Sequence, residues 1–136
     1  MKNLLVSALS FACLVQPVGA GQWQSEENKG IFLHTIQDGT ARLELVCDPE
    51  KLWIPPEFHV VVSEAGQFLQ GNTVEVSTDV ETLTVPLSGG SILGRDPDVW
   101  NSIVAMLAQP GTVSFKADEQ ELTFNIDGEL TVDCNL

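Results

Sequence analysis

The chain has 136 residues and a mass of 14.7 kDa, which is enough for one domain with a buried core and too little for two. It is 43% hydrophobic and 18% charged, a composition typical of a globular protein rather than a disordered one. Six basic residues stand against nineteen acidic residues, for a formal net charge of -13. Such a surface repels phosphate backbones and anionic lipid headgroups, which argues against binding to nucleic acid or to a membrane surface.

The first twenty residues have the features of a secretory signal peptide. Lys2 supplies a charged start, an apolar run follows from Leu4 to Val15, and small residues precede Gly21. The apolar run is about a dozen residues long, shorter than the roughly 20 that a bilayer-spanning helix needs. We therefore predict cleavage after Ala20, no membrane span, and a single mature domain from 21 to 136 in the periplasm or outside the cell.

Two alternatives apply to this N-terminal segment. Cys13 invites comparison with a lipoprotein signal, in which the cysteine is acylated and becomes the first mature residue. The residues Ser10-Phe11-Ala12 fit that signal poorly, because a bulky Phe stands where a small residue is required, and the apolar run continues beyond Cys13. The other alternative is a buried N-terminal helix. We favour a cleaved signal peptide over both.

Alternating apolar and polar residues predict strands in the first part of the mature domain. The expected strands cover residues 31–37, 41–47, 57–64, 73–78 and 81–87. Asp38-Gly39 separates the first two and favours a type I′ hairpin turn. The last two are expected to form a second hairpin that turns near Asp79.

One segment changes from alternation to helical spacing. Its apolar residues recur three or four positions apart: Val99, Trp100, Ile103, Val104 and Leu107. Asp96 is suited to cap the helix, Pro97 suits the first helical position, and Gln109-Pro110-Gly111 ends the pattern. The sequence therefore predicts one amphipathic helix of about ten to twelve residues.

Alternation returns after the helix, in residues 112–117 and 122–126, with a polar turn at Asp118-Glu119 between them. Asp127-Gly128 then leads into a last alternating run through Leu130, Val132 and Cys134. The predicted fold class is mainly β with one helix, a β-rich α+β arrangement. We expect an antiparallel sheet or sandwich of about seven strands, covered by the amphipathic helix.

The mature domain keeps two cysteines, Cys47 and Cys134, and each ends an alternating run on its apolar face. In an oxidising compartment a lone pair of this kind normally forms a disulfide. The wide spacing is unlike that of the close pairs used for zinc binding or thiol exchange. We predict a structural disulfide between Cys47 and Cys134, with a reactive thiol pair as the alternative.

Residues for catalysis or metal binding are scarce. His34 and His59 both fall in expected strands, where we expect surface or half-buried side chains, and the cysteines are already assigned to each other. A zinc site needs three or four converging ligands, and the Gly-x-Ser-x-Gly pattern of a hydrolase nucleophile is missing from the sequence. We predict no catalytic, metal or cofactor residues. Two alternatives remain: a small hydrolase with a histidine beside an acid in a pocket, and a divalent-metal-binding module using surface acids and histidines.

The segment Gly89–Asp96 has the two glycine positions of a phosphate-binding loop and precedes the expected helix. It has Arg95 and Asp96 where that loop requires Lys and then Ser or Thr. We therefore interpret it as a flexible connector.

The loop Trp53-Ile54-Pro55-Pro56 is the candidate partner-binding loop. It places apolar and rigid residues where a polar turn is expected. A rigid aromatic tip of this kind can anchor a partner protein. The other interpretation, which the sequence alone favours, is that Trp53 and Ile54 fold back to plug the open end of the sheet.

The C-terminal third resembles the end of a known family. An amphipathic helix over Trp100–Leu107 is followed by Gly111-Thr112-Val113-Ser114-Phe115, then Thr123-Phe124-Asn125-Ile126-Asp127-Gly128, and then Cys134. This order resembles the invasion-associated locus B family of small exported bacterial proteins, although the further cysteines expected near the first strands are missing. That family has no established catalytic residues to carry over. The resemblance implies an exported binding or envelope-associated protein.

Together these observations predict a small, exported, non-enzymatic protein that binds another protein. From residue 21 onward five basic and nineteen acidic residues leave a net charge of -14. Such a charge would steer a cationic partner toward the protein. One specific form of the hypothesis is an inhibitor of a basic secreted enzyme such as lysozyme.

Overall fold

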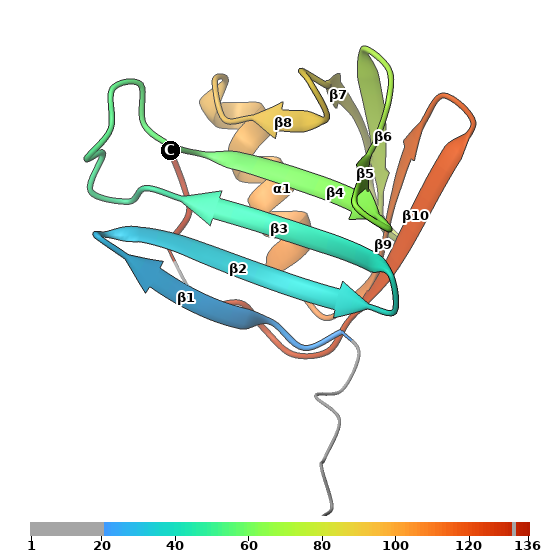
Figure 1. Ribbon diagram of the computed structural model, residues 1–136, viewed down its shortest axis with the longest axis horizontal. Coiled ribbons are helices and arrows are strands. Elements are labelled where there is room, and N and C mark those ends of the chain that lie inside the picture. The colour runs from blue at the N-terminus through green and yellow to red at the C-terminus, as the bar shows by residue number, and fades with distance from the viewer. Residues whose placement is uncertain (1–20, 132) are drawn as a thin grey trace, which may run out of the picture.

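The computed structural model in Figure 1 describes residues 21–131 and 133–136. The described chain forms ten strands and one helix: β1 (Gln24–Asn28), β2 (Ile31–Asp38), β3 (Ala41–Cys47), β4 (His59–Glu64), β5 (Gln67–Phe68), β6 (Thr73–Ser77), β7 (Thr82–Pro86), β8 (Ser91–Leu93), α1 (Pro97–Ala108), β9 (Gly111–Ala117) and β10 (Gln120–Ile126). The predicted fold class, mainly β with one helix, is confirmed. The predicted signal peptide, residues 1–20, and Cys13 within it lie outside the described residues.

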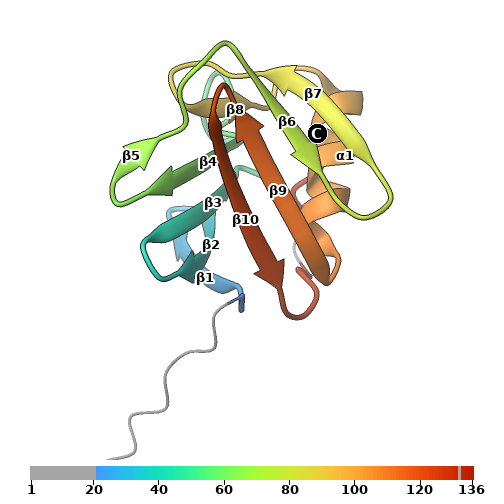
Figure 2. The same cartoon turned by 90° about the vertical axis from the view of Figure 1, so that its right-hand side faces the viewer.

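The strands make two antiparallel sheets that share one core. The first sheet has the order β1-β2-β3-β4-β5, with β8 also paired to β4, and the second has the order β10-β9-β6-β7. In Figure 1 the first sheet faces the viewer with α1 behind it, whereas in Figure 2 the second sheet faces the viewer. The helix therefore closes the side of the core that the two sheets leave open.

Alternation along each strand explains this core, because successive side chains point to opposite faces of a sheet. In the first sheet Ile36, Leu43 and Val62 lie opposite one another across β2, β3 and β4, and all three are buried. In the second sheet Val76 lies opposite Phe115, and both are buried. The helix adds five buried side chains to this core: Trp100, Ile103, Val104, Met106 and Leu107.

The predicted hairpins are present, with one change of turn type. Strands β2 and β3 pair from Asp38↔Ala41 onward, so Gly39 and Thr40 are the two central residues of the turn. Only Gly39, with φ of 60°, has a positive φ. A glycine at the first central position is typical of a type II′ turn, so the predicted type I′ turn at Asp38-Gly39 is wrong. The β6–β7 and β9–β10 hairpins pair as expected.

The helix begins where its capping signals lie. Asp96 accepts hydrogen bonds at Oδ1 from the backbone N–H groups of Asp98 and Val99, at 3.0 and 3.3 Å. Pro97 occupies the first turn, and the helix ends at Ala108 with Gln109 as its C-cap. Its 12 residues are about three fifths of the roughly 20 that a membrane crossing requires. None of the helical structure in the described residues is long and apolar enough to cross a membrane.

The segment before the helix, which the sequence predicts to be a flexible connector, contains a short strand. Its residues Ser91–Leu93 form β8 against β4. The N–H of Gly94 donates to the carbonyl of Phe58 at 2.8 Å, and a Cβ placed on Gly94 would lie only 2.6 Å from the Phe58 Cβ. The N–H groups of Ser91, Gly94 and Arg95 all donate to backbone carbonyls. These donors are therefore committed to the fold and do not form a phosphate cradle.

The last alternating run does not form a strand. Leu130 and Cys134 are buried as the alternation predicts, but residues 127–131 and 133–136 belong to no strand, and Val132 lies outside the described residues. Alternation reports which side chains face the core. It does not supply a neighbouring strand for the backbone to pair with.

Instead, the C-terminal segment (residues 130, 131 and 133–136) lies along α1. The N–H of Leu130 donates to the carbonyl of the last helical residue at 3.1 Å, and the indole Nε1–H of Trp100 donates to the carbonyl of Cys134 at 2.7 Å. The Asn101 side chain accepts from the N–H of Leu136 at 2.9 Å and donates to its carbonyl at 3.3 Å. The C-terminal segment is therefore held by hydrogen bonds to the helix and not by pairing with a strand.

Candidate functional site

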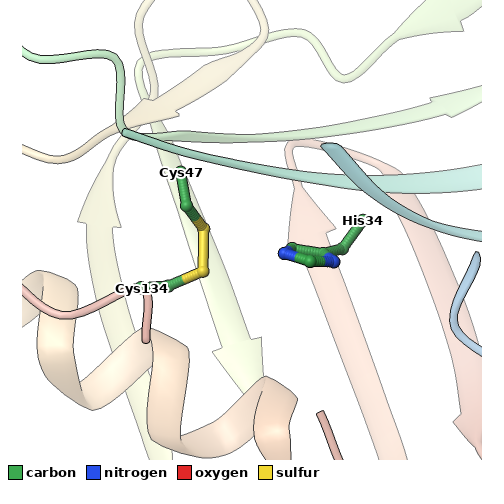
Figure 3. A group of neighbouring side chains, drawn as sticks. All are labelled: His34, Cys47 and Cys134. Carbon is green, nitrogen blue, oxygen red and sulfur yellow. A yellow bond between two sulfur atoms is a disulfide. The ribbon is translucent and has the colours of Figure 1, made fainter. Parts of the chain in front are cut away.

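The disulfide is present between Cys47 and Cys134, as predicted (Figure 3). Their Cα atoms lie 5.3 Å apart, and both residues are fully buried. Cys47 ends β3, and Cys134 lies in the C-terminal segment against α1. The bond therefore ties the first sheet to the segment that runs along the helix.

His34 lies beside this disulfide, with one ring nitrogen directed toward it (Figure 3). The residue is on β2, is fully buried, and shares a hydrogen bond of 2.7 Å between its Nδ1 and Ser25 Oγ. Its Nε2 is buried with no hydrogen-bond partner. Burial lowers the pKa of His34 below its ordinary 6.5, because a dry environment disfavours the charged imidazolium.

The expectation of a surface or half-buried His34 is wrong. Its signal was available, because His34 alternates in phase with Phe32 and Ile36 on the inner face of β2. His59, in contrast, lies on the outer face of β4, partly exposed, with its Nδ1 3.5 Å from a carboxylate oxygen of Glu57. The sheet thus separates the two histidines.

The candidate partner-binding loop projects from the end of the first sheet, between β3 and β4. Ile54 is 99% exposed, Trp53 is 55% exposed, and the neighbouring Leu52 is 52% exposed. The interpretation that Trp53 and Ile54 fold back to plug the sheet is therefore wrong. The core is closed instead by α1 and by Phe58, which packs edge-on against Trp100 with ring centroids 5.9 Å apart.

A single buried carboxylate holds the base of this loop. Asp48 accepts hydrogen bonds from the backbone N–H groups of Leu52 at 2.8 Å, Trp53 at 3.0 Å and Glu57 at 3.3 Å. Burial raises the pKa of the Asp48 carboxyl, and the three N–H donors lower it. The donors outweigh burial, so the pKa of Asp48 lies below its ordinary 3.8. Asp48 was not among the site residues expected from the sequence. An aspartate directly after a strand is the signal, since Asp side chains often bond to backbone N–H groups a few residues ahead.

The loop also packs against the turn between β1 and β2. A Cβ placed on Gly30 would lie 2.3 Å from Leu52 Cδ1, so a side chain at this position would push the tip of the Leu52 side chain aside. Gly30 has φ of +84°, which also favours glycine. Leu52 is thus held over the turn, while Trp53 and Ile54 extend beyond it.

A hollow of about 520 Å³ lies between this loop and the outer face of the first sheet. Its floor is apolar and is made by Ile31, Leu33 and Val46, which are half-buried, and Trp53 lines one side. Its remaining lining is polar or charged: Glu26, Asn28, Lys29 and Glu57. The register places Glu26 opposite Leu33 and Leu33 opposite Val46, so the hollow crosses β1, β2 and β3. The arrangement offers an apolar surface with two carboxylates at its rim.

Comparisons with known proteins add no relationship to this geometry. No protein-family model, no curated protein and no solved structure matches the chain. The resemblance of the C-terminal third to the invasion-associated locus B family remains an expectation from the sequence.

Proposed function

We propose that this chain is an exported, non-enzymatic protein that binds a basic protein partner. Binding occurs through the Trp53 loop, residues 53–56, and the adjoining hollow. The observation that carries the proposal is the exposure of Trp53 and Ile54 on a loop whose base is pinned by three hydrogen bonds to Asp48. Tryptophan is strongly enriched among the residues that dominate binding energy at protein interfaces. Exposed apolar groups on a held loop also lose little entropy when a partner covers them.

Charge indicates what kind of partner fits. The mature domain carries -14, and the hollow beside the loop is lined by Glu26 and Glu57 together with one base, Lys29. Complementary charge raises the rate of encounter with a cationic partner and disfavours anionic ones. A basic secreted enzyme such as lysozyme fits this description, and an inhibitor would be one form of such a binder. Export is consistent with the buried disulfide, which forms and persists in oxidising compartments.

The test compares capture by two variants. The double variant Trp53→Ala, Ile54→Ser removes the apolar tip, and Val80→Ser is the matched control because Val80 is 94% exposed on the β6–β7 turn. We expect wild type and the control to retain the same basic protein from envelope extracts, and the loop variant to lose it. Equal retention by all three proteins would overturn the proposal.

A kinetic measurement tests the charge of the partner. With the captured protein purified, and with lysozyme as a defined cationic probe, association rates are measured over a series of salt concentrations. Steering by opposite charge predicts an association rate that falls steeply as salt rises, because the Debye length shortens from about 10 Å at 0.1 M to about 3 Å at 1 M. An association rate that does not change with salt would contradict a basic partner.

A further inference from the structure

Three donor groups converge in the core at the disulfide. One ring nitrogen of His34 and the two sulfur atoms of Cys47 and Cys134 all lie within 4.8 Å of one another, and all three residues are fully buried. The imidazole comes from β2, one sulfur from the end of β3, and the other from the C-terminal segment (Figure 3). Imidazole and thiolate are the ligands that zinc and related thiophilic cations prefer.

The unpartnered nitrogen is an independent observation that points to a ligand. A polar side-chain atom buried without a partner is costly, and His34 Nε2 is such an atom. In the tautomer whose Nδ1–H donates to Ser25 Oγ, Nε2 carries a free lone pair. Metal-binding histidines use this arrangement, in which the second ring nitrogen donates to an oxygen that orients the ring. The neutral imidazole, the form that binds a metal, is also the one that burial favours.

We propose that the reduced form of this protein binds one thiophilic divalent cation of the zinc class through His34, Cys47 and Cys134. The disulfide first takes two electrons and two protons from a dithiol reductant, which itself becomes a disulfide, and two thiols result. The cation then displaces the two thiol protons and bonds to two thiolates and the imidazole. Two thiolates, one neutral imidazole and one divalent cation sum to zero charge, so the buried site carries no net charge. A water molecule that enters the buried site together with the cation would supply the fourth ligand of a tetrahedral complex.

The C-terminal segment controls access to this site. Both sulfur atoms are buried, and the segment over them is held by the Trp100 indole on the Cys134 carbonyl and by the paired bonds between Asn101 and Leu136. A protein dithiol reaches the disulfide when this segment moves away from α1. The cation then restores the link between β3 and the C-terminal segment that reduction has broken.

The test uses the full chain with Cys13→Ala, so that only Cys47 and Cys134 supply thiols. The protein is reduced in urea with a phosphine, diluted into buffer that keeps the thiols reduced, and titrated with Co²⁺ as a spectroscopic probe for Zn²⁺. We expect one equivalent of Co²⁺ to produce thiolate-to-cobalt charge-transfer absorption and tetrahedral d–d bands. Zn²⁺ should abolish both and raise the melting temperature of the reduced protein. The oxidised protein should show none of these changes.

Matched variants distinguish binding through His34 and both cysteines from chelation by the cysteines alone. We expect His34→Gln to weaken Co²⁺ binding at least tenfold and His59→Gln to leave it unchanged, because His59 lies on the opposite face of the sheet. Ser25→Ala should weaken binding by about 10-fold to 100-fold, the usual effect of losing the group that orients a ligand. Cys47→Ala, Cys134→Ala should abolish it. The melting temperature of each oxidised single variant shows that it folds.

Two results would overturn the proposal. The first is a reduced, folded protein that gives no cobalt absorption. The second is a His34→Gln variant that folds when oxidised and binds Co²⁺ as tightly as wild type when reduced. Neither result bears on the Trp53 loop, so the metal site and the proposed partner binding stand or fall separately.

Discussion

Breaking the Cys47–Cys134 disulfide should produce a large loss of stability. The two residues are 87 positions apart in the sequence. In the chain-entropy model, a crosslink over a loop of this length stabilises the native state by about 4 to 5 kcal/mol, because it restricts the unfolded chain. Small domains have a total unfolding free energy of about 5 to 15 kcal/mol. The crosslink therefore supplies a major part of the stability of this fold.

This free energy corresponds to a measurable shift in melting temperature. For a domain of 116 residues, from Gly21 to Leu136, the unfolding entropy near the melting temperature is about 240 cal/mol/K. We therefore expect reduction to lower the melting temperature by about 15 to 20 °C. In urea titrations the m-value should rise as well, because an uncrosslinked chain exposes more surface when it unfolds.

The assay separates the crosslink from the packing of the two sulfur atoms. Calorimetry and urea titration are run on oxidised wild type, on reduced wild type with a metal chelator present, and on Cys47→Ala, Cys134→Ala. Reduced wild type keeps both sulfur atoms, so its loss measures the crosslink, and any further loss in the double variant measures packing. A reduced protein that melts within about 3 °C of the oxidised one would refute the entropic argument. A loss of about 4 kcal/mol in unfolding free energy requires a much larger fall in melting temperature.

Three further predictions concern the loop, the turn beneath it and the N-terminus. Asp48→Asn should lower the melting temperature at neutral pH, because an amide cannot accept three backbone N–H bonds as the carboxylate does. Since the folded pKa of Asp48 lies below 3.8, its stabilisation is fully present above pH 3.8 and is lost as the pH falls through the folded pKa. Melting curves of the two proteins should therefore converge in acid, and a pH-independent difference would contradict this. Gly30→Ala should destabilise the fold in urea titrations by at most about 1 kcal/mol more than Gly39→Ala, because both glycines have positive φ and the half-exposed Leu52 side chain beside Gly30 can rotate away. A much larger difference would show that Leu52 is held rigidly. The intact mass of the exported protein should equal that of a chain that begins at Gly21. A chain that begins at a lipid-modified Cys13 would show that the predicted cleavage site is wrong.

Much of the fold could be predicted from the sequence, because side-chain periodicity is a local property. The alternation in residues 31–47 determined which side chains of β2 and β3 face the core, and helical spacing with the Asp96 cap determined where α1 begins. Alternation in two separate runs, one ending at Cys47 and the other at Cys134, placed both cysteines on core-facing positions. The disulfide could therefore be predicted from the sequence. Alternation also placed His34 in phase with buried neighbours, a pattern that indicates a buried side chain.

Pairing depended on the tertiary structure. Strand β1 has five exposed residues and no apolar alternation, so nothing in its own sequence indicates a strand, and β2 supplies its hydrogen-bond partners. Strands β5 and β8 are two and three residues long and likewise exist because β4 pairs with them. The run that ends at Cys134 shows the opposite case, with correct alternation but a helix as its neighbour. Backbone hydrogen bonds need a neighbouring strand, and the periodicity of one segment does not indicate which segment will lie beside it.

In the candidate sites, too, the sequence indicated individual residues and the tertiary structure decided which of them meet. The residues of the Trp53 loop were apparent in the sequence, but Asp48, whose carboxylate holds the base of the loop, was not. Likewise, His34 and the two cysteines were each visible, while their convergence within 4.8 Å required the C-terminal segment to lie beside β3. A sequence determines which face each residue presents. Only the packing of distant segments determines which residues meet, because that distance depends on every element between them.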